Sequence, residues 1–581
     1  MAKFEVPGDP ADTSESSHAT NPNTPEHVEA PLAKDLGERA GEVIRDDQQE
    51  RGCLQEFLHD QFGFEKLNLC CDSRVRLLLK HAEGNSAIKL NPEATRQEIS
   101  AEPTGILRRP GDPLVVKLLG SLQSRSEAKC TLNVKSVSCE IYYIPNSDNA
   151  ILFNRTPSRI SMKSSSGSTK MVDPWQAVTL GPASWVLSNR NDTINFILLP
   201  RRYHLRVEEQ TGTAVRRSAD TSLCEPVAKK AKGPAGSSTR TVDPKATTRL
   251  EKPTTIWAGV DLQENQLVQV TDRVTGHVEY SVRRLTNWAH QKSCSEAFKA
   301  ILNDETSKPE VVIVKILAKP SVNNMNVIRA AREWSQEFGI HQSLRHFKPH
   351  IAELRGWDAR TMSLFVGYKQ SRDLGSDHWR AEDNTFRGND IDACRIIAQM
   401  SSALQYLNEQ GISHNDIKPG NILYTPTPWP ATGPYPATST GAVLIDFGHA
   451  TSADRFQPGG TPWYIPIEYN EGKRGPPSDI FALGVVMLYV MRRIPLPEKW
   501  SKYPGWWLHR AKEPETVKAS NAWQEEIFRQ AKALSSRSIF ARKDKLYRLV
   551  HAMLDRRAEE RITAPDLVEE TKILLDMTGQ S

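Results

Sequence analysis

Four polar residues, three of them close together in the chain, have the types and order that phosphoryl transfer needs. Asp416, Lys418 and Asn421 lie within six positions, and Asp446 follows twenty-five positions after Asn421. A carboxylate at Asp416 can orient or accept the proton of an attacking hydroxyl, and an amine at Lys418 can neutralise charge on a transferred phosphoryl group. The oxygens of Asn421 and Asp446 are hard ligands of the kind that Mg2+ binds. This order is the one that phosphoryl transfer from ATP requires.

An amphipathic helix and two apolar strands are expected to position these residues. The helix is indicated by apolar side chains at helical spacing, and Gly411 ends it. The members of this apolar face are Ile396, Ile397, Met400, Leu404 and Leu407. The run Ala442-Val-Leu-Ile445 predicts a buried strand leading into Asp446, and the run Val311-Val-Ile-Val predicts another that ends in Lys315.

The stretch His414-Asn-Asp-Ile-Lys-Pro-Gly-Asn421, with Asp446-Phe-Gly448, resembles the catalytic and metal-binding loops of eukaryotic protein kinases. Two distant features agree with the same family. The segment Gly460 to Glu468 resembles the end of an activation segment, and Asp479 to Gly484 opens an apolar helix as in the family. The resemblance implies an α+β, two-lobed kinase fold over residues 251–577, with a β-rich N-lobe and a helical C-lobe.

The resemblance also implies a role for each matching residue. Asp416 and Lys418 would be catalytic, Asn421 and Asp446 would hold Mg2+, and Lys315 would bind the ATP phosphates. A helix glutamate would position the lysine; Glu337 has the better spacing, with Glu333 as the alternative. The strand and hinge that bind adenine would contain Val366 and Tyr368. Thr461 would hydrogen-bond near Asp416, and Arg561 would pair with Glu468.

The chain departs from the family at two places. The glycine-rich loop that covers the phosphates would fall on residues 271–278, where only Gly276 and Val278 match, so we expect weaker ATP binding. Asn415 stands where the family usually has an arginine that binds an activation-loop phosphate. We therefore expect activity to be largely independent of phosphorylation of that loop.

The residues before the kinase-like part form three segments by composition. Residues 1–50 hold twelve acidic and four basic residues, and we expect them to be disordered. Residues 51–207 are expected to contain an all-β sandwich, because short strand-like runs recur from about residue 125. Such a sandwich before a kinase is similar to forkhead-associated domains, which bind phosphothreonine peptides. Asn154, Arg155, Ser158 and Arg159 cluster as candidate phosphate ligands, although the family's own ligand motifs are absent.

Residues 208–250 read as a flexible basic linker. Within it, Lys229, Lys230 and Lys232 follow Pro226 in the form that an importin groove can bind, which predicts a nuclear protein, or otherwise a cytoplasmic one. The chain shows no signal segment and no apolar run that would span a membrane, and its net charge of +5 indicates nothing about nucleic acid. Eight cysteines without CxxC spacing argue against a disulfide framework or a zinc site.

Three functions are compatible with these features. The first is an active serine/threonine protein kinase that uses ATP and Mg2+ to phosphorylate proteins. The second is a pseudokinase scaffold, indicated by the missing glycines and by Asn415. The third is a small-molecule phosphotransferase, since His-Asn-Asp with a downstream Asn and Asp also occurs there. Thr461, Glu468, Asp479 and Arg561 argue against the third, because they resemble a peptide-substrate platform.

Overall fold

The fold is taken from a computed structural model that describes residues 75–81, 89–90, 117–122, 128–207 and 262–576. Short gaps inside these ranges are residues 135, 146, 165–166, 191, 202, 274–275, 292–294, 305–306, 318–322, 345–348, 427–440, 511 and 536–541. The expected disordered N-terminus and the linker with its three lysines lie outside the described residues.

The N-terminal part is β-rich, as the sequence predicts. One sheet has the strand order β3-β1-β11-β10-β7-β8 and a second has the order β2-β4-β5-β6-β9. Side chains of both sheets share one apolar core, in which Leu77 and Phe196 of the first sheet join Ile141 and Leu152 of the second. The two sheets therefore pack face to face as a sandwich. The strands are β1 (Val75–His81), β2 (Lys89–Leu90), β3 (Lys117–Leu122), β4 (Lys129–Val134), β5 (Val137–Tyr143), β6 (Ala150–Asn154), β7 (Ile160–Ser164), β8 (Thr169–Val172), β9 (Ala177–Leu180), β10 (Ala183–Asn189) and β11 (Asp192–Leu198).

The next sheet forms most of the N-lobe and has the order β12-β13-β14-β15-β16-β18-β17 among the described residues. Its strands are β12 (Tyr203–Val207), β13 (Leu267–Asp272), β14 (Val278–Gln291), β15 (Glu296–Asp304), β16 (Glu310–Ile316), β17 (Leu354–Asp358) and β18 (Ser363–Gly367). The sequence assigned residues up to 207 to the N-terminal domain. Strand β12 instead pairs with β13 and belongs to the N-lobe sheet.

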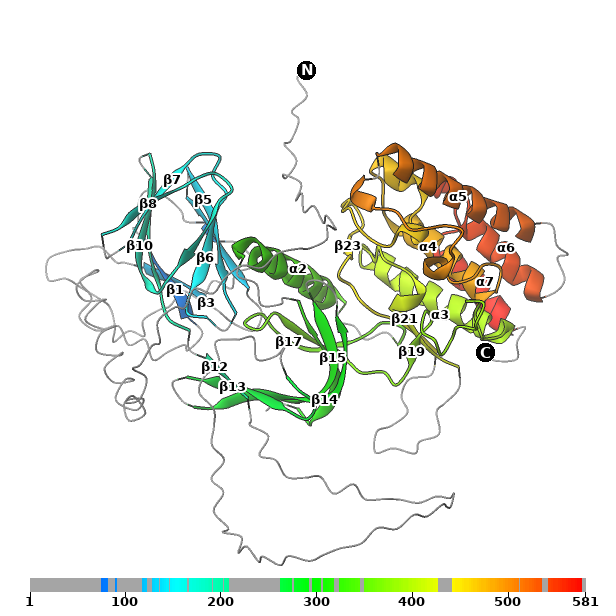
Figure 1. The fold of residues 1–581 in the computed structure, drawn as a ribbon, viewed down its shortest axis with the longest axis horizontal. Helices are drawn as coiled ribbons and strands as arrows, with labels where there is room; N and C mark the ends of the chain where they lie inside the picture. The colour runs from blue at the N-terminus through cyan, green and yellow to red at the C-terminus, as the bar shows by residue number, and fades with distance from the viewer. Residues whose placement is uncertain are drawn as a thin grey trace, which may run out of the picture. The chain divides into compact units, whose positions relative to one another are not determined.

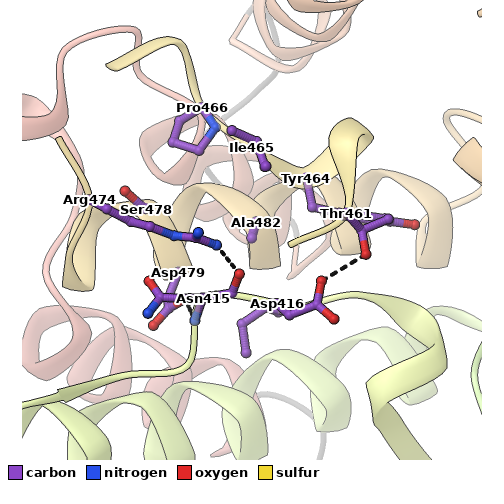
Figure 2. A pocket seen from close by; sticks show the side chains of 11 residues that line it. Asn415, Asp416, Thr461, Tyr464, Ile465, Pro466, Arg474, Ser478, Asp479 and Ala482 are labelled. Carbon is purple, nitrogen blue, oxygen red and sulfur yellow. Dashed lines mark hydrogen bonds between the residues drawn. The ribbon is translucent and has the colours of Figure 1, made fainter. Parts of the chain in front are cut away.

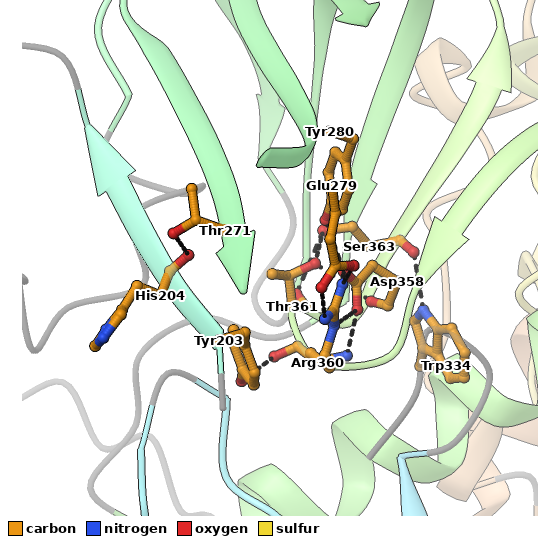
Figure 3. A network of polar contacts seen from close by, with 10 residues as sticks. All are labelled: Tyr203, His204, Thr271, Glu279, Tyr280, Trp334, Asp358, Arg360, Thr361 and Ser363. Atoms are coloured by element: carbon orange, nitrogen blue, oxygen red, sulfur yellow. Dashed lines mark hydrogen bonds and ion pairs between the residues drawn. The ribbon is translucent and has the colours of Figure 1, made fainter. Parts of the chain in front are cut away.

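Strand β12 also makes side-chain contacts with the N-lobe. Figure 3 shows the Tyr203 hydroxyl directed at the Arg360 carbonyl oxygen, to which it donates at 3.3 Å. The Arg360 guanidinium is buried between the carboxylates of Asp358 and Glu279, each within 2.7 Å. Tyr280 donates its hydroxyl to the same Asp358 at 2.8 Å. The contacts join β12 to a fully partnered buried charge network at the β17–β18 turn.

Helix α2 (Asn324–Ser343) is the one helix that the structure describes between β16 and β17. Asn323 caps its N-terminus, because its side chain accepts a hydrogen bond from the Met325 amide at 2.9 Å. Trp334 is fully buried and donates its indole N–H to the Ser363 carbonyl at 3.1 Å, which fixes the helix to β18 (Figure 3). The inner face of the helix is therefore fixed against the sheet.

The outer face of α2 packs against the second sheet of the sandwich. Arg332 donates from Nε to the Tyr142 hydroxyl at 2.9 Å and from Nη2 to the Glu140 carboxylate at 3.0 Å. Beside these bonds, Ile151 and Phe153 of β6 share one apolar cluster with the buried side chains of α2. The sandwich thus contacts the helix that carries Glu337.

The C-lobe is helical, and Figure 1 shows its helices gathered together in the lime-green-to-red part of the chain. The helices are α3 (Asp390–Glu409), α4 (Pro476–Val490), α5 (Pro514–Leu534), α6 (Arg542–Met553) and α7 (Ala564–Asp576), and small strands β19 (Arg372–Asp373), β20 (Ile412–Ser413), β21 (Ile422–Thr425), β22 (Gly441–Leu444) and β23 (Thr451–Ser452) accompany them. Helix α3 begins with a capping box of Asn389 and Asp392. Helix α4 is buried almost all round, as its apolar sequence predicts. The predicted α+β class, with a sheet-rich N-lobe and a helical C-lobe, is confirmed.

Among the described residues, no helix combines the length and the apolarity that crossing a lipid bilayer would require.

Candidate active site

Lys315 lies in an ion-paired cluster with two carboxylates from other elements. Strand β16 buries Val312, Val314 and Ile316 on one face, so Lys315 projects from the other. Its Nζ lies 2.7 and 2.8 Å from the two Glu337 oxygens and 2.6 Å from Asp446 Oδ1. Burial alone would lower the pKa of Lys315, but the charges of Asp446 and Glu337 outweigh it and hold the pKa above its usual range.

The rival glutamate does not reach this cluster. Glu333 lies one turn earlier on α2, is almost half exposed, and has Arg329 as its nearest cation at 4.0 Å. The helix places the two glutamates four residues apart, but only Glu337 is buried against Lys315. Of the two glutamates, Glu337 is therefore the one that contacts Lys315.

A second cluster surrounds the Asp416 carboxylate. Thr461 donates its hydroxyl to Oδ1 at 2.7 Å, and Lys418 donates from Nζ to Oδ2 at 2.8 Å. Lys418 also donates to the Thr461 hydroxyl at 2.8 Å, and Asn421 donates from Nδ2 to Asp416 Oδ2 at 3.0 Å. Figure 2 shows Thr461 and Asp416 directed toward each other. These bonds fix the orientation of the carboxylate before any substrate arrives.

His414 makes hydrogen bonds to the backbone beside both clusters. Its Nε2 lies 3.1 Å from the Ile445 carbonyl, directly before Asp446, and its Nδ1 accepts from the Asp416 amide at 3.3 Å. Burial lowers the pKa of His414 to about 4, so the ring is neutral at physiological pH. A neutral imidazole that is fully buried in this way supports the loop, as the family resemblance implies.

Asp446 has a backbone conformation that directs the following phenylalanine into the core. Its φ is +65°, in the left-handed region that non-glycine residues rarely adopt. The Phe447 ring packs between the rings of His341 and His414, with 5.0 Å between centroids on each side. This packing holds Asp446 toward Lys315. His341 was not found from the sequence, because a lone histidine on a helix gives no signal of such a contact.

Asp479 anchors the backbone of the loop at residues 414–421, the candidate catalytic loop. Its two carboxylate oxygens accept from the amides of His414 and Asn415, at 2.7 and 2.8 Å. Burial raises the pKa of Asp479 to about 6. Further along, Glu468 and Arg561 form a buried pair with two hydrogen bonds of 2.5 and 2.9 Å. Both arrangements agree with the roles implied by the resemblance.

The residues fit a magnesium nucleotide. No group of three or more His, Cys, Asp or Glu side chains forms a metal site among the described residues. Where a substrate carries phosphates, Mg2+ is commonly held by one or two protein oxygen ligands together with those phosphates. Asn421 uses its Nδ2 on Asp416, which leaves Oδ1 for a cation, and the Ile445 amide bonds to the Asn421 carbonyl at 3.0 Å. That bond places Asn421 beside the residue that leads into Asp446.

The expected adenine site lies at the end of β18. Val366 pairs with Ile313 on β16, two residues from Lys315. Tyr368 follows the strand, its amide donates to the Val311 carbonyl at 3.3 Å, and its ring is covered by Lys299 at 4.0 Å. Both residues are only partly buried, as the lining of a nucleotide site should be.

The structure does not bring Gly276 and Val278 to Lys315, so the predicted phosphate-covering loop is wrong. Gly276 and Val278 lie where β13 leads into β14. Lys315 pairs with Ala297 of β15, and Ala297 pairs with His290, which lies at the opposite end of β14. Strand β14 has fourteen residues. At about 3.3 Å per residue, the path along the strand between its ends is roughly 40 Å long. The strand ends next to Lys315 are instead those of β14 and β15, where Gln291 pairs with Glu296, and residues 286–300 of the sequence contain no glycine.

The candidate phosphate ligands of the sandwich make contacts within it, while the side chains of Arg155 and Arg159 stay 43% and 59% exposed. Asn154 is buried and its Nδ2 donates to three backbone carbonyls. Arg155 lies near Glu140 and over the Trp175 ring, and Arg159 pairs with Asp173. These side chains therefore stabilise the loops that carry them.

Comparisons with known proteins agree with this geometry. Residues 293–572, just under half of the chain, match the family model described as protein kinase domain. The chain is 30% identical over 183 residues to Aurora kinase A-A of Xenopus laevis, which covers 30% of this chain and 40% of that protein. It is 34% identical over 129 residues to serine/threonine-protein kinase ULK3 of Homo sapiens, covering 22% and 25% respectively. It is 36% identical over 109 residues to MAP kinase-activated protein kinase 2 of Drosophila melanogaster, covering 18% and 28%. The chain thus matches less than half the length of each of these relatives.

Proposed function

We propose that this chain is a serine/threonine protein kinase that transfers the γ-phosphate of ATP to protein hydroxyls. The observation that carries the proposal is the assembled cluster of Lys315, Glu337 and Asp446, joined through His414 to a fixed Asp416 carboxylate. The contact of Thr461 with both Asp416 and Lys418 supports serine/threonine acceptors, since the family resemblance associates this residue with that class.

Each residue has a distinct part in the proposed reaction. Asp416 would orient the acceptor hydroxyl and receive its proton, because its carboxylate is already held by three donors. Lys418, 2.8 Å from that carboxylate, would neutralise charge at the transferred group. Lys315 would hold the nucleotide phosphates. When bound, ATP with Mg2+ supplies the phosphoryl group and the divalent charge that the reaction requires.

Transfer of labelled phosphate from ATP to generic protein acceptors tests the proposal. Asp416→Asn and Asp446→Ala should each lower the rate by about a hundredfold or more, because each removes a general base or a metal ligand. Glu569→Gln, an exposed surface change on α7, serves as the matched control and should leave the rate unchanged. Purified protein that binds ATP with Mg2+ but transfers no label above the Asp446→Ala level would refute the proposal.

A pseudokinase scaffold is the second candidate, and the β14–β15 connection favours it. Glycines there normally allow backbone amides to approach the phosphates, and residues 286–300 have none. Thermal-shift titration with ATP and Mg2+ separates the candidates: a scaffold would show no nucleotide protection but would keep its protein binding when Asp416 is replaced. A small-molecule phosphotransferase is less favoured, because the Glu468–Arg561 pair and Thr461 support a peptide-binding segment.

For the N-terminal sandwich we propose a forkhead-associated-like fold whose main role is to pack against α2. The two-sheet arrangement and the contacts of Arg332 with Tyr142 and Glu140 support this. Phosphopeptide binding has less support, because Asn154, Arg155 and Arg159 already have partners. Titration of a phosphothreonine peptide library against the full chain, with unphosphorylated peptides as the control, would detect binding that these contacts do not predict.

Nuclear import is also proposed, on the basic cluster of Lys229, Lys230 and Lys232 alone. Replacing the three lysines by alanine should abolish importin binding in a pull-down and move a fluorescent fusion to the cytoplasm. Nuclear fluorescence that survives the triple change would contradict this assignment.

A further inference from the structure

Asn415, the residue before Asp416, carries no charge that could pair with a phosphate on the activation segment (residues 446–468). Other contacts must therefore order that segment. Asn415 is buried, has a φ of +65°, and donates from Nδ2 to the carbonyls of Ser413 and His449 and to the Thr451 hydroxyl. These bonds of 2.9 to 3.2 Å join the catalytic loop to the first part of the segment. They offer no positive charge to a phosphate.

Arg474, from the connection before α4, reaches into the same region. Its Nη1 donates to the carbonyls of Gln457 and Gly459, at 3.0 and 2.8 Å, and its Nη2 donates to the Asn415 carbonyl. Figure 2 shows the Arg474 side chain extended toward Asn415. Within the described residues, no carboxylate forms an ion pair with this guanidinium. Burial lowers the pKa of Arg474, although Asp479, Tyr469 and Asp416 partly offset the effect.

The segment has a backbone that permits this close approach. Gly459 and Gly460 have φ values of +136° and +101°, which side-chain-bearing residues rarely adopt. A Cβ on Gly460 would lie 2.9 Å from both Arg474 Nη2 and the Asn415 carbonyl oxygen, closer than such atoms can pack. The Tyr469 hydroxyl accepts from the Gly459 amide at 3.0 Å, and the Arg474 guanidinium lies over the Tyr469 ring. Gly459 is therefore held at both its amide and its carbonyl.

The same contacts extend to α2. Gln336, next to Glu337, donates from Nε2 to the Gln457 side-chain oxygen and to the Ala450 carbonyl, both at 2.9 Å. The backbone carbonyl of Gln457 in turn accepts a hydrogen bond from Arg474. A continuous set of hydrogen bonds thus runs from α2 through the activation segment to the residue preceding Asp416.

We propose that Arg474 is a positioning residue that orders the activation segment without phosphorylation, by binding the carbonyls of residues 415, 457 and 459. A guanidinium suits this role because its five N–H donors in a rigid plane can serve several carbonyls at once. A lysine has a single nitrogen and cannot reach all three. The inference rests on the proposed kinase function for its effect on rate, but the order of the segment is measurable without activity.

Hydrogen exchange followed by mass spectrometry on the full chain tests the proposal. Arg474→Met removes the donors and keeps much of the bulk, and it should speed exchange of amides in residues 453–463 by about tenfold or more. Arg474→Lys should fall between this variant and the wild type. In kinase assays, Arg474→Met should raise KM for the protein acceptor and lower kcat/KM by about tenfold, with a smaller change in KM for ATP, since Arg474 makes no direct contact with the Lys315 cluster and reaches α2 only through Gln457 and Gln336.

Lys473→Met is the matched control, because Lys473 is exposed and pairs only with Glu471 among the described residues; its exchange and kinetics should equal those of the wild type. Phosphatase treatment of the wild type should change neither. If Arg474→Met fails to fold, Gly460→Ala disturbs the same contact from the segment and should open the same amides. Exchange unaffected by both variants, or opened in the wild type by phosphatase, would overturn the proposal. A wild type without kinase activity would refute the proposed function, while exchange would still decide the role of Arg474.

Discussion

Replacement of Glu337 by glutamine tests how Lys315 is held. The substitution keeps the size of the side chain but removes the charge that contacts Nζ at 2.7 and 2.8 Å. A hydrogen bond between charged groups contributes about 1.5–3 kcal/mol, which corresponds to roughly a 10- to 150-fold change. Lys315 keeps its 2.6 Å contact with Asp446, so the lysine should turn toward that carboxylate and away from the nucleotide. We expect kcat/KM for ATP to fall by this factor.

The same α2 helix supplies the control for this change. Glu333→Gln alters a half-exposed carboxylate whose nearest cation is 4.0 Å away, so it should leave kcat/KM for ATP within about twofold of the wild type. Initial rates at varied ATP and saturating protein acceptor measure both variants, and calorimetric titration with ATP and Mg2+ measures binding directly. Equal losses in the two variants, or no loss in Glu337→Gln, would refute the assignment.

Three further predictions concern stability. Arg561→Met should destabilise the C-lobe by about 3–5 kcal/mol, because it leaves the Glu468 carboxylate buried without its partner; urea unfolding should show a much smaller loss when Glu468→Gln is added. Burial lowers the pKa of His341 to about 3, so the unfolded chain binds the proton first as the pH falls below 6.5, and about 2 kcal/mol should be lost between about pH 7 and pH 5. His341→Leu should remove that share of the pH dependence, and an unchanged slope would show that the ring is not held neutral. Arg332→Met should speed hydrogen exchange in α2, whereas Arg329→Met, an exposed change on the same helix, should not.

Much of the candidate site was predictable because its residues are close together in the chain. Asp416, Lys418 and Asn421 occupy one short loop, and Asp446 follows a strand that pairs with the strand after that loop. Short loops between regular elements restrict where side chains can lie. The positions of Glu468 and Arg561 are 93 residues apart, but each lies in a motif that could be matched to the family by itself.

The order of strands in the N-lobe was not predictable in the same way. Alternating apolar residues indicate that a segment is a strand, but any such strand can pair with any other of similar pattern. The sequence therefore placed the phosphate-covering loop at Gly276, one hairpin too early, and gave β12 to the wrong domain. The position of the phosphate-covering loop is decided by the pairing of β15 with β16. The domain to which β12 belongs is decided by its pairing with β13.

The sequence by itself determined which chemical groups are available and which local elements carry them, because spacing along a helix, strand or short loop fixes which side chains are neighbours. Tertiary structure alone decided which groups from distant segments form hydrogen bonds with one another. Asn154 has the amide expected of a phosphate ligand, yet the fold commits it to backbone carbonyls. Arg474 lies in a surface-like run of charged residues, yet the fold buries it against the activation segment. Burial and partners depend on contacts between segments far apart in the chain, and no local pattern encodes them.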